Sequence, residues 1–123
     1  MAEVVAGLGF RPGAHVEALL AAVRQTRGEH RIRYLATVDR RAEEPGLTAA
    51  ATELAVPVLS FTPEELAEIE VPHPAARTAA AIGTPSVAEA AALLAAGTDR
   101  LMLPKQVLFG ITIAIAEMPG RRP

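Results

Sequence analysis

A glycine-rich turn is the first segment whose residue types suit chemistry. Gly7-Leu8-Gly9-Phe10-Arg11-Pro12-Gly13 follows an apolar run and precedes a helical pattern. Glycines let backbone N–H groups approach an anion, the start of the next helix favours negative charge, and Arg11 would add a guanidinium. The GxGxxxG spacing is one residue longer than the dinucleotide fingerprint. Two interpretations stay open: a tight strand-to-helix turn, or an anion site that includes Arg11.

A run of charged residues follows the second predicted strand, in Asp39-Arg40-Arg41-Ala42-Glu43-Glu44-Pro45-Gly46. In an open α/β sheet the carboxyl ends of the strands face the ligand crevice, so charges at this position suit recognition. A solvated loop that leads into a helix explains them equally well. We expect Arg40 to be solvated.

Two further candidates lie in the second half of the chain. In Gly83-Thr84-Pro85-Ser86, either Thr84 caps the next helix, or Ser86 caps it and Glu89 completes a capping box. A cap explains these residues fully, although its N–H groups would also suit an anion. Lys105 is the only lysine in the chain, which favours a role for a point charge. A general preference for arginine is the alternative explanation.

The elements that must position these residues alternate between strand and helix patterns. Strands are predicted at residues 4–10, 32–38, 56–61, 100–103 and 111–116. Longer helices are predicted at 14–26, at 45–54 and from about 87 to Gly97. A short helix is predicted from the Thr62 capping box through 69, and a helical turn at 76–82 after a proline-rich connector at 71–75. The last two strands are about six residues apart, too close for a parallel crossover. We therefore predict an α/β fold. It is a single three-layer α/β/α domain over residues 1–123, with a mixed sheet of about five strands and a final antiparallel hairpin.

Composition excludes several classes of function. The net charge is −2, the isoelectric point is near 5.9 and aromatic residues make up 3%, so we expect no nucleic-acid partner. Cysteine is absent, which excludes a thiol nucleophile and fits a cytoplasmic location. The three histidines have no ligand spacing, so we expect neither a metal site nor a cofactor. We expect no signal peptide and no membrane-spanning segment.

Several segments, taken in order, resemble the CobE family of cobalamin biosynthesis, which is equivalent to the C-terminal domain of CbiG. They are residues 7–13 (GLGFRPG), 39–47 (DRRAEEPGL), 61–66 (FTPEEL), 83–91 (GTPSVAEAA), and 103–105 (LPK) with 111–116 (ITIAIA). This sequence departs from the family pattern at Phe10, where cysteine is usual. Arg41 replaces the usual lysine, Glu43 replaces aspartate, and residues 107–109 are apolar where the family is polar or basic.

The resemblance implies a role in building the corrin ring. Full-length CbiG proteins open a lactone on cobalt-precorrin-5A and release a two-carbon fragment as acetaldehyde, whereas free-standing CobE-like proteins belong to the aerobic route. The implied partner is a precorrin or cobalt-precorrin intermediate, with other corrin-pathway enzymes as candidate partners. A hydrolase and a non-catalytic carrier both stay open, so the sequence leaves open whether the protein is an enzyme.

A precorrin is a large, flat, multiply carboxylated macrocycle, which calls for separated cations or N–H donors and an apolar wall. We therefore predict substrate-binding roles for Gly9, Arg11, Arg41, Gly46, Thr84, Ser86, Val87 and Lys105. For lactone hydrolysis, the candidate general bases are Asp39, Glu43 and Glu44. We expect Arg11 and Ser86 to share one cleft along the carboxyl edge of the sheet.

Two alternatives belong to other classes of function. One is a small nucleotide- or phosphate-binding module, in which the glycine turn would bind phosphate and Asp39 a ribose hydroxyl. The other is a structural subunit without a small ligand. The two alternatives predict different outcomes when the protein is mixed separately with a nucleotide and with a precorrin.

Overall fold

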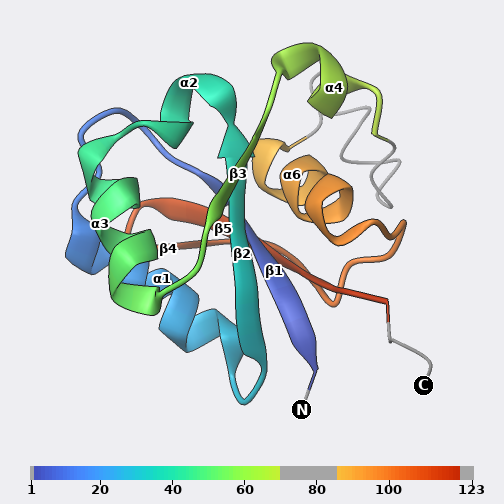
Figure 1. The fold of residues 1–123 in the computed structure, drawn as a ribbon, viewed down its shortest axis with the longest axis horizontal. Coiled ribbons are helices and arrows are strands. Elements are labelled where there is room, and N and C mark those ends of the chain that lie inside the picture. The colour runs from blue at the N-terminus through green and yellow to red at the C-terminus, as the bar shows by residue number, and fades with distance from the viewer. Residues whose placement is uncertain (1, 70–85, 120–123) are drawn as a thin grey trace.

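The fold is a five-stranded mixed sheet with helices on both faces (Figure 1). The computed structural model describes residues 2–69 and 86–119. The strands are β1 (Glu3–Gly9), β2 (Arg31–Val38), β3 (Val58–Phe61), β4 (Leu103–Leu108) and β5 (Ile111–Glu117). The helices are α1 (Val16–Arg27), α2 (Asp39–Ala42), α3 (Pro45–Leu54), α4 (Pro63–Ala67) and α6 (Val87–Ala96). The predicted fold class is confirmed.

The strand order is β3-β2-β1-β5-β4, so β1 lies at the centre and β4 at one edge. β1 pairs in parallel with β2, and β2 with β3, whereas β5 is antiparallel to both β1 and β4. The carboxyl ends of β1, β2 and β3 therefore lie at the same end of the sheet. The turn between β4 and β5 lies at this end too.

Alternate residues of β1 enter two separate cores. Val4, Ala6 and Leu8 pack with α1 and α3, whereas Val5 packs with α6. Both sets are fully buried because helices cover both faces of the sheet (Figure 1). Such two-sided burial explains why β1 and β5 are almost continuously apolar in the sequence.

Helix α6 packs unusually close to β1. A Cβ atom added to Gly7 would lie 1.9 Å from the carbonyl oxygen of Ala88 and 2.7 Å from the amide nitrogen of Ala92. The helix surface at this contact consists of small side chains, and Ala90, Ala91 and Ala92 are fully buried. The alanine-rich composition thus permits the approach of one backbone to another.

Capping residues set the ends of several helices as predicted. Thr62 forms a complete capping box with Glu65 at α4, and the Ser86 side chain caps α6. Pro45 lies in the first turn of α3, and Gly28 and Gly97 follow the last residues of α1 and α6. The predicted connector at 71–75 and helical turn at 76–82 lie outside the described residues.

Two parts of the predicted element pattern differ most from the structure. The fourth strand is not at 100–103 but extends from Leu103 to Leu108, and the connection to β5 is the two-residue turn Phe109-Gly110. Periodicity missed this strand because it lies at the sheet edge, where Lys105, Gln106 and Val107 are all exposed. In addition, Asp39–Ala42 forms the short helix α2 rather than a loop.

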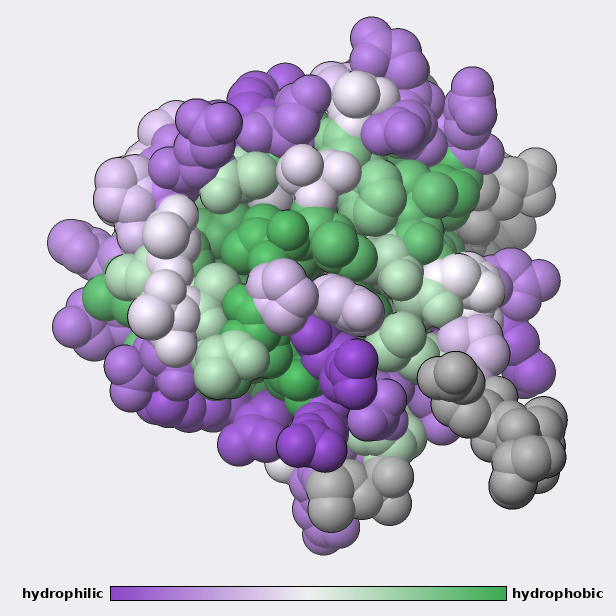
Figure 2. All heavy atoms as spheres, viewed as in Figure 1, coloured by the Kyte–Doolittle hydropathy of each residue, from purple (hydrophilic) through white to green (hydrophobic). Residues whose placement is uncertain are grey.

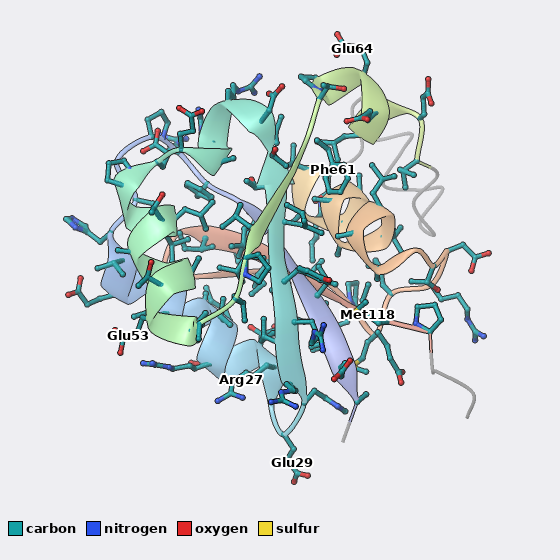
Figure 3. The ribbon with its side chains drawn as sticks, in the orientation of Figure 1. Arg27, Glu29, Glu53, Phe61, Glu64 and Met118 are labelled. Carbon is teal, nitrogen blue, oxygen red and sulfur yellow. The ribbon has the colours of Figure 1, made fainter. Side chains whose placement is uncertain are left out.

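The outer surface separates polar from apolar side chains. Figure 2 shows hydrophobic residues near the middle of the view, where β3 runs between the two helical layers, and hydrophilic residues around them. In Figure 3, Glu29, Glu53 and Glu64 point outward, whereas Phe61 points toward α6 and packs against its core. Within the described ranges, no helix has the length and apolar character needed to span a membrane.

Candidate functional site

A cleft lies where the start of α6 faces strand β4. We call it the α6–β4 cleft; it has a volume of about 390 Å³ and is lined by Gly9, Ser86, Val87, Ala88, Lys105, Val107 and Thr112. Gly9 is the last residue of β1, so the cleft lies at the carboxyl end of the central strand. This is the position at which open α/β sheets bind their ligands.

The helix side of the cleft is the N-terminus of α6. The Ser86 hydroxyl oxygen accepts a hydrogen bond from the backbone N–H of Glu89 at 3.3 Å. Ser86 and Val87 are half-buried, and the rest of the first turn is buried against the sheet. The N-terminal end of a helix carries partial positive charge, so this side of the cleft favours an anion.

The strand side of the cleft combines a cation with an apolar side chain. Lys105 and Val107 lie two residues apart on β4 and line the same cleft, and Val107 is 68% exposed. The β4–β5 register shifts between Leu103 and Gln106. At this irregularity the backbone N–H of Lys105 donates a hydrogen bond to Glu89 Oε2 at 3.0 Å.

Glu89 is a buried residue for which the sequence predicts only a role in the helix cap. It is 1% exposed and lies directly behind the cleft, between α6 and β4. One feature of the sequence could have singled out Glu89, because it is the only charged residue in the helix VAEAAALLAA. A single acid in an otherwise apolar, buried helix requires a partner.

Arg11 does not share the cleft with Ser86, which corrects the prediction that one cleft would hold both. It lies in a second hollow of about 210 Å³ on the α1 side of the sheet, lined by Phe10, Arg11, Pro12, Gly13, Ala14, His15, Ala18, Phe109, Gly110 and Ile111. The chain turns toward α1 after β1, whereas α6 covers the opposite face. The tip of the β4–β5 hairpin separates the two sites, because Val107 lines one and Phe109 the other.

The segment 39–46 braces the β1–α1 loop. Arg41 Nε donates to the carbonyl oxygen of Phe10 at 2.9 Å, and Glu44 Oε1 accepts from the Gly13 N–H at 3.0 Å. A Cβ atom on Gly46 would lie 2.2 Å from the carbonyl oxygen of Ala14, so α3 can begin at this place only with glycine. These contacts are structural, and direct roles for Arg41 and Gly46 in binding stay predictions.

The three predicted general bases do not line the α6–β4 cleft. Asp39 and Glu43 are exposed on and just after α2, and Glu44 is half-buried and bonded to the β1–α1 loop. Their catalytic roles stay predictions. Thr84 lies outside the described residues, so the structure brings together Gly9, Ser86, Val87 and Lys105 from the predicted binding set.

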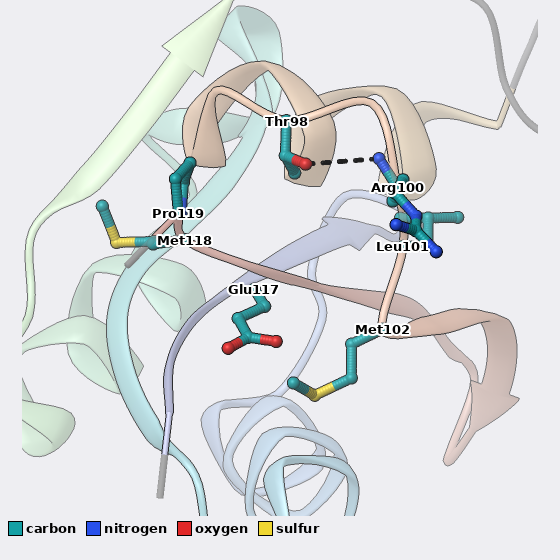
Figure 4. A pocket seen from close by; sticks show the side chains of 7 residues that line it. All are labelled: Thr98, Arg100, Leu101, Met102, Glu117, Met118 and Pro119. Carbon is teal, nitrogen blue, oxygen red and sulfur yellow. Dashed lines mark hydrogen bonds between the residues drawn. The ribbon is translucent and has the colours of Figure 1, made fainter. Parts of the chain in front are cut away.

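Another hollow, of about 430 Å³, lies at the opposite end of the sheet (Figure 4). Its lining includes Arg100, Met102 and Glu117, and Thr98 Oγ1 accepts a hydrogen bond from the Arg100 N–H at 3.4 Å. Glu117 pairs with Val4 near the start of β1, away from the carboxyl ends of the strands. The position favours the α6–β4 cleft as the ligand site. Within residues 2–69 and 86–119, no three potential metal ligands are grouped so that they could hold a metal ion.

Comparison with known proteins identifies the family. A family model described as the cobalamin synthesis G C-terminus matches residues 4–116. The chain belongs to this cobalamin-biosynthesis family. The resemblance found in the sequence is therefore confirmed.

Individual relatives agree with this membership. The chain is 26% identical to a cobalt-precorrin-5A hydrolase from Priestia megaterium over 118 residues, which cover 92% of this chain and 32% of that protein. The crystal structure of a cobalamin biosynthesis protein, chiG, from Agrobacterium tumefaciens is 38% identical and matches with a TM-score of 0.74, over 96% of this chain and 99% of that one. CobE, a protein from the cobalamin (vitamin B12) biosynthetic pathway, is 32% identical with a TM-score of 0.75, over 98% and 94% of the two chains.

Proposed function

We propose that this protein binds a carboxylated precorrin-type intermediate of corrin-ring construction in the α6–β4 cleft. The observation that carries the proposal is the meeting of three features: the only lysine, the N-terminus of α6 and the exposed apolar Val107. Carboxylates of the ligand would bind Lys105 and the N–H groups at the start of α6. The flat face of the macrocycle would lie against Val107.

Arg11 extends the proposed site around the tip of the hairpin. It is exposed in the neighbouring hollow beside Phe109, which is 59% exposed. A ligand with several carboxylates around a broad ring can reach across the tip, whereas a small anion cannot contact both sides. We therefore propose that Arg11 and Lys105 bind different carboxylates of one ligand.

Ring-lactone hydrolysis is the reaction that the similarity to a cobalt-precorrin-5A hydrolase supports. In this reaction, water adds to the lactone carbonyl, the ring C–O bond breaks, and a carboxylate and an alcohol form. Acetaldehyde is released when the carbon–carbon bond between the alcohol carbon and the macrocycle then breaks, so that the alcohol C–O becomes the aldehyde carbonyl and the hydroxyl proton is replaced by one on the macrocycle carbon. Because the match covers only 32% of that hydrolase, and no described cleft-lining residue is a carboxylate, carriage of the intermediate without catalysis is the second candidate. Incubation with cobalt-precorrin-5A and detection of acetaldehyde distinguishes the two candidates.

The nucleotide-binding alternative has less support. Gly7, the first glycine of the turn, is already in contact with α6 and has no room for a phosphate. Family membership points to the corrin pathway instead. We further propose that the protein acts beside other enzymes of this pathway, which its family membership supports. The proposed location is the cytoplasm, which fits a chain without cysteine.

Binding is tested by an absorbance titration with cobyrinic acid, a stable carboxylated corrin. We expect Arg11→Ala and Lys105→Ala to weaken binding by roughly tenfold to a hundredfold, because each removes a charge-assisted contact of about 1.5–3 kcal/mol. Arg40→Ala, which removes an exposed arginine from α2, is the matched control and should change the affinity little. Equal affinities for all three variants, or no binding by the unmodified protein, would refute the proposal.

A further inference from the structure

The molecule contains two glutamates at the same position of a helix, bonded in different ways. At α4, Glu65 Oε1 accepts from the N–H of the cap residue Thr62 at 2.8 Å, and Thr62 Oγ1 accepts from the Glu65 N–H at 3.0 Å. At α6, the Ser86 hydroxyl likewise accepts from the Glu89 N–H, but the Glu89 carboxylate bonds to the backbone of Lys105. Helix capping therefore accounts for Glu65 and does not account for the Glu89 side chain.

The Glu89 contact links the two sides of the α6–β4 cleft. Residues 89 and 105 are separated by 16 positions in sequence, and their bond joins the first turn of α6 to the edge strand β4. The acceptor is 1% exposed, whereas the donor belongs to an exposed residue. A hydrogen bond to a buried carboxylate is both strong and directional, so it fixes the donor backbone.

The hydrogen bond between Lys105 and Glu89 forms where the register of β4 is irregular. The pairing with β5 shifts between Leu103 and Gln106, and Lys105 lies inside the shift. A β-bulge redirects side chains and commonly occurs beside functional sites. Here the bond from Lys105 to Glu89 holds the irregular backbone against α6, on the side where Lys105 lines the cleft.

We propose that Glu89 is a positioning residue that fixes the backbone of Lys105 and thereby directs the lysine amine into the ligand cleft. The assignment of a carboxylated corrinoid as the ligand rests on the proposed function above. The positioning itself does not require a ligand. The two parts can therefore be tested separately.

The ligand-free test measures hydrogen exchange at the Lys105 amide by NMR. Glu89→Ala removes the acceptor and should accelerate this exchange by at least about tenfold, whereas Glu89→Gln keeps a side-chain oxygen acceptor and should largely preserve the protection. Glu65→Ala is the matched control, since it should accelerate exchange at Thr62 and leave Lys105 unchanged. If Glu89→Ala does not fold, Glu89→Asp, which withdraws the carboxylate by one methylene, takes its place. Unchanged exchange at Lys105 overturns the proposal.

The ligand test repeats the cobyrinic acid titration. Glu89→Ala should weaken binding roughly tenfold, and Glu89→Gln should retain the affinity within about threefold. The double variant of Glu89→Ala with Lys105→Ala should bind about as weakly as Lys105→Ala alone, because both substitutions act through the same amine. Full additivity of the two substitutions, or full affinity of Glu89→Ala, overturns the positioning role. If the unmodified protein does not bind cobyrinic acid, the proposed function fails, and the exchange measurement alone decides the role of Glu89.

Discussion

Two glycines of β1 differ in what surrounds them. Gly7 faces α6 so closely that a side chain there would overlap the backbone of Ala88 and Ala92. Gly9 lies two residues further on, at the cleft, where an added Cβ would be 3.7 Å from Thr112 Cβ and 3.9 Å from Val87 Cβ. Gly7 therefore permits the close packing of a helix, whereas Gly9 leaves space in the α6–β4 cleft.

Substitution separates the two glycines. Gly7→Ala should lower the free energy of unfolding by about 1–3 kcal/mol, because α6 must move away from the sheet to admit the methyl group. Gly9→Ala adds the same group at ordinary contact distance and should change stability by less than about 0.5 kcal/mol. Urea denaturation followed by circular dichroism measures both. Equal losses for the two variants would show that the close packing of α6 on Gly7 is not what limits this position.

The β4–β5 hairpin separates the α6–β4 cleft from the second hollow. Its turn has φ values of 57° at Phe109 and 78° at Gly110, as a two-residue type I′ turn requires. Glycine suits this backbone, whereas a bulky residue with positive φ is strained. Phe109 is nevertheless 59% exposed, so burial does little to offset the strain. Phe109 also lines the second hollow, together with Arg11, and we propose contact with the ligand there as the functional reason for its presence.

Phe109→Asn tests this explanation of the hairpin. Asparagine tolerates positive φ, so the substitution should raise the free energy of unfolding by roughly 0.5–1 kcal/mol while weakening the binding of cobyrinic acid. Phe109→Leu, which keeps an apolar side chain and the strain, is the control and should not gain stability. Thermal unfolding and the absorbance titration provide the two measurements. A loss of stability in Phe109→Asn would mean that the contacts of the ring outweigh the backbone strain.

At the scale of the whole molecule, the sheet order distributes stability unevenly. β1 pairs on both sides and contributes to both cores, whereas β3 and β4 each pair on one side only. The proposed ligand contacts of Lys105 and Val107 therefore belong to the less constrained edge of the sheet. Among the described residues that line the cleft, the central strand β1 contributes Gly9 and the neighbouring strand β5 contributes Thr112.

Native-state hydrogen exchange tests this distribution. The amides of β1 should exchange at rates close to global unfolding, and those of β4 should exchange faster through local opening, apart from the amide bonded to Glu89. Mass spectrometry of peptides covering Glu3–Gly9 and Leu103–Leu108 measures the difference. Equal protection of the two strands would contradict the prediction that β4 opens locally more readily than β1.

Much of the architecture follows from the sequence alone. The sequence predicts where most helices and strands lie, because the signals for them are local and depend on a few neighbouring residues. These signals are the alternating apolar periods, the capping box at Thr62 and the glycines after α1 and α6. The family was also recognisable, because its segments occur in order along the chain. The edge strand β4 was predicted with the wrong limits because an exposed strand needs no apolar alternation.

The tertiary structure alone decided how the candidate residues are grouped. Sequence placed Arg11 and Ser86 at ends of elements that meet one edge, but it did not specify on which face of the sheet each helix packs. The hydrogen-bond partner of Glu89 could not be predicted from the sequence either. A capping position predicts a bond to a neighbouring residue, whereas the observed bond joins residues 16 positions apart. Such contacts depend on the packing of α6 against β1 and on the register of β4, which are set by the whole fold and not by neighbouring residues in the chain.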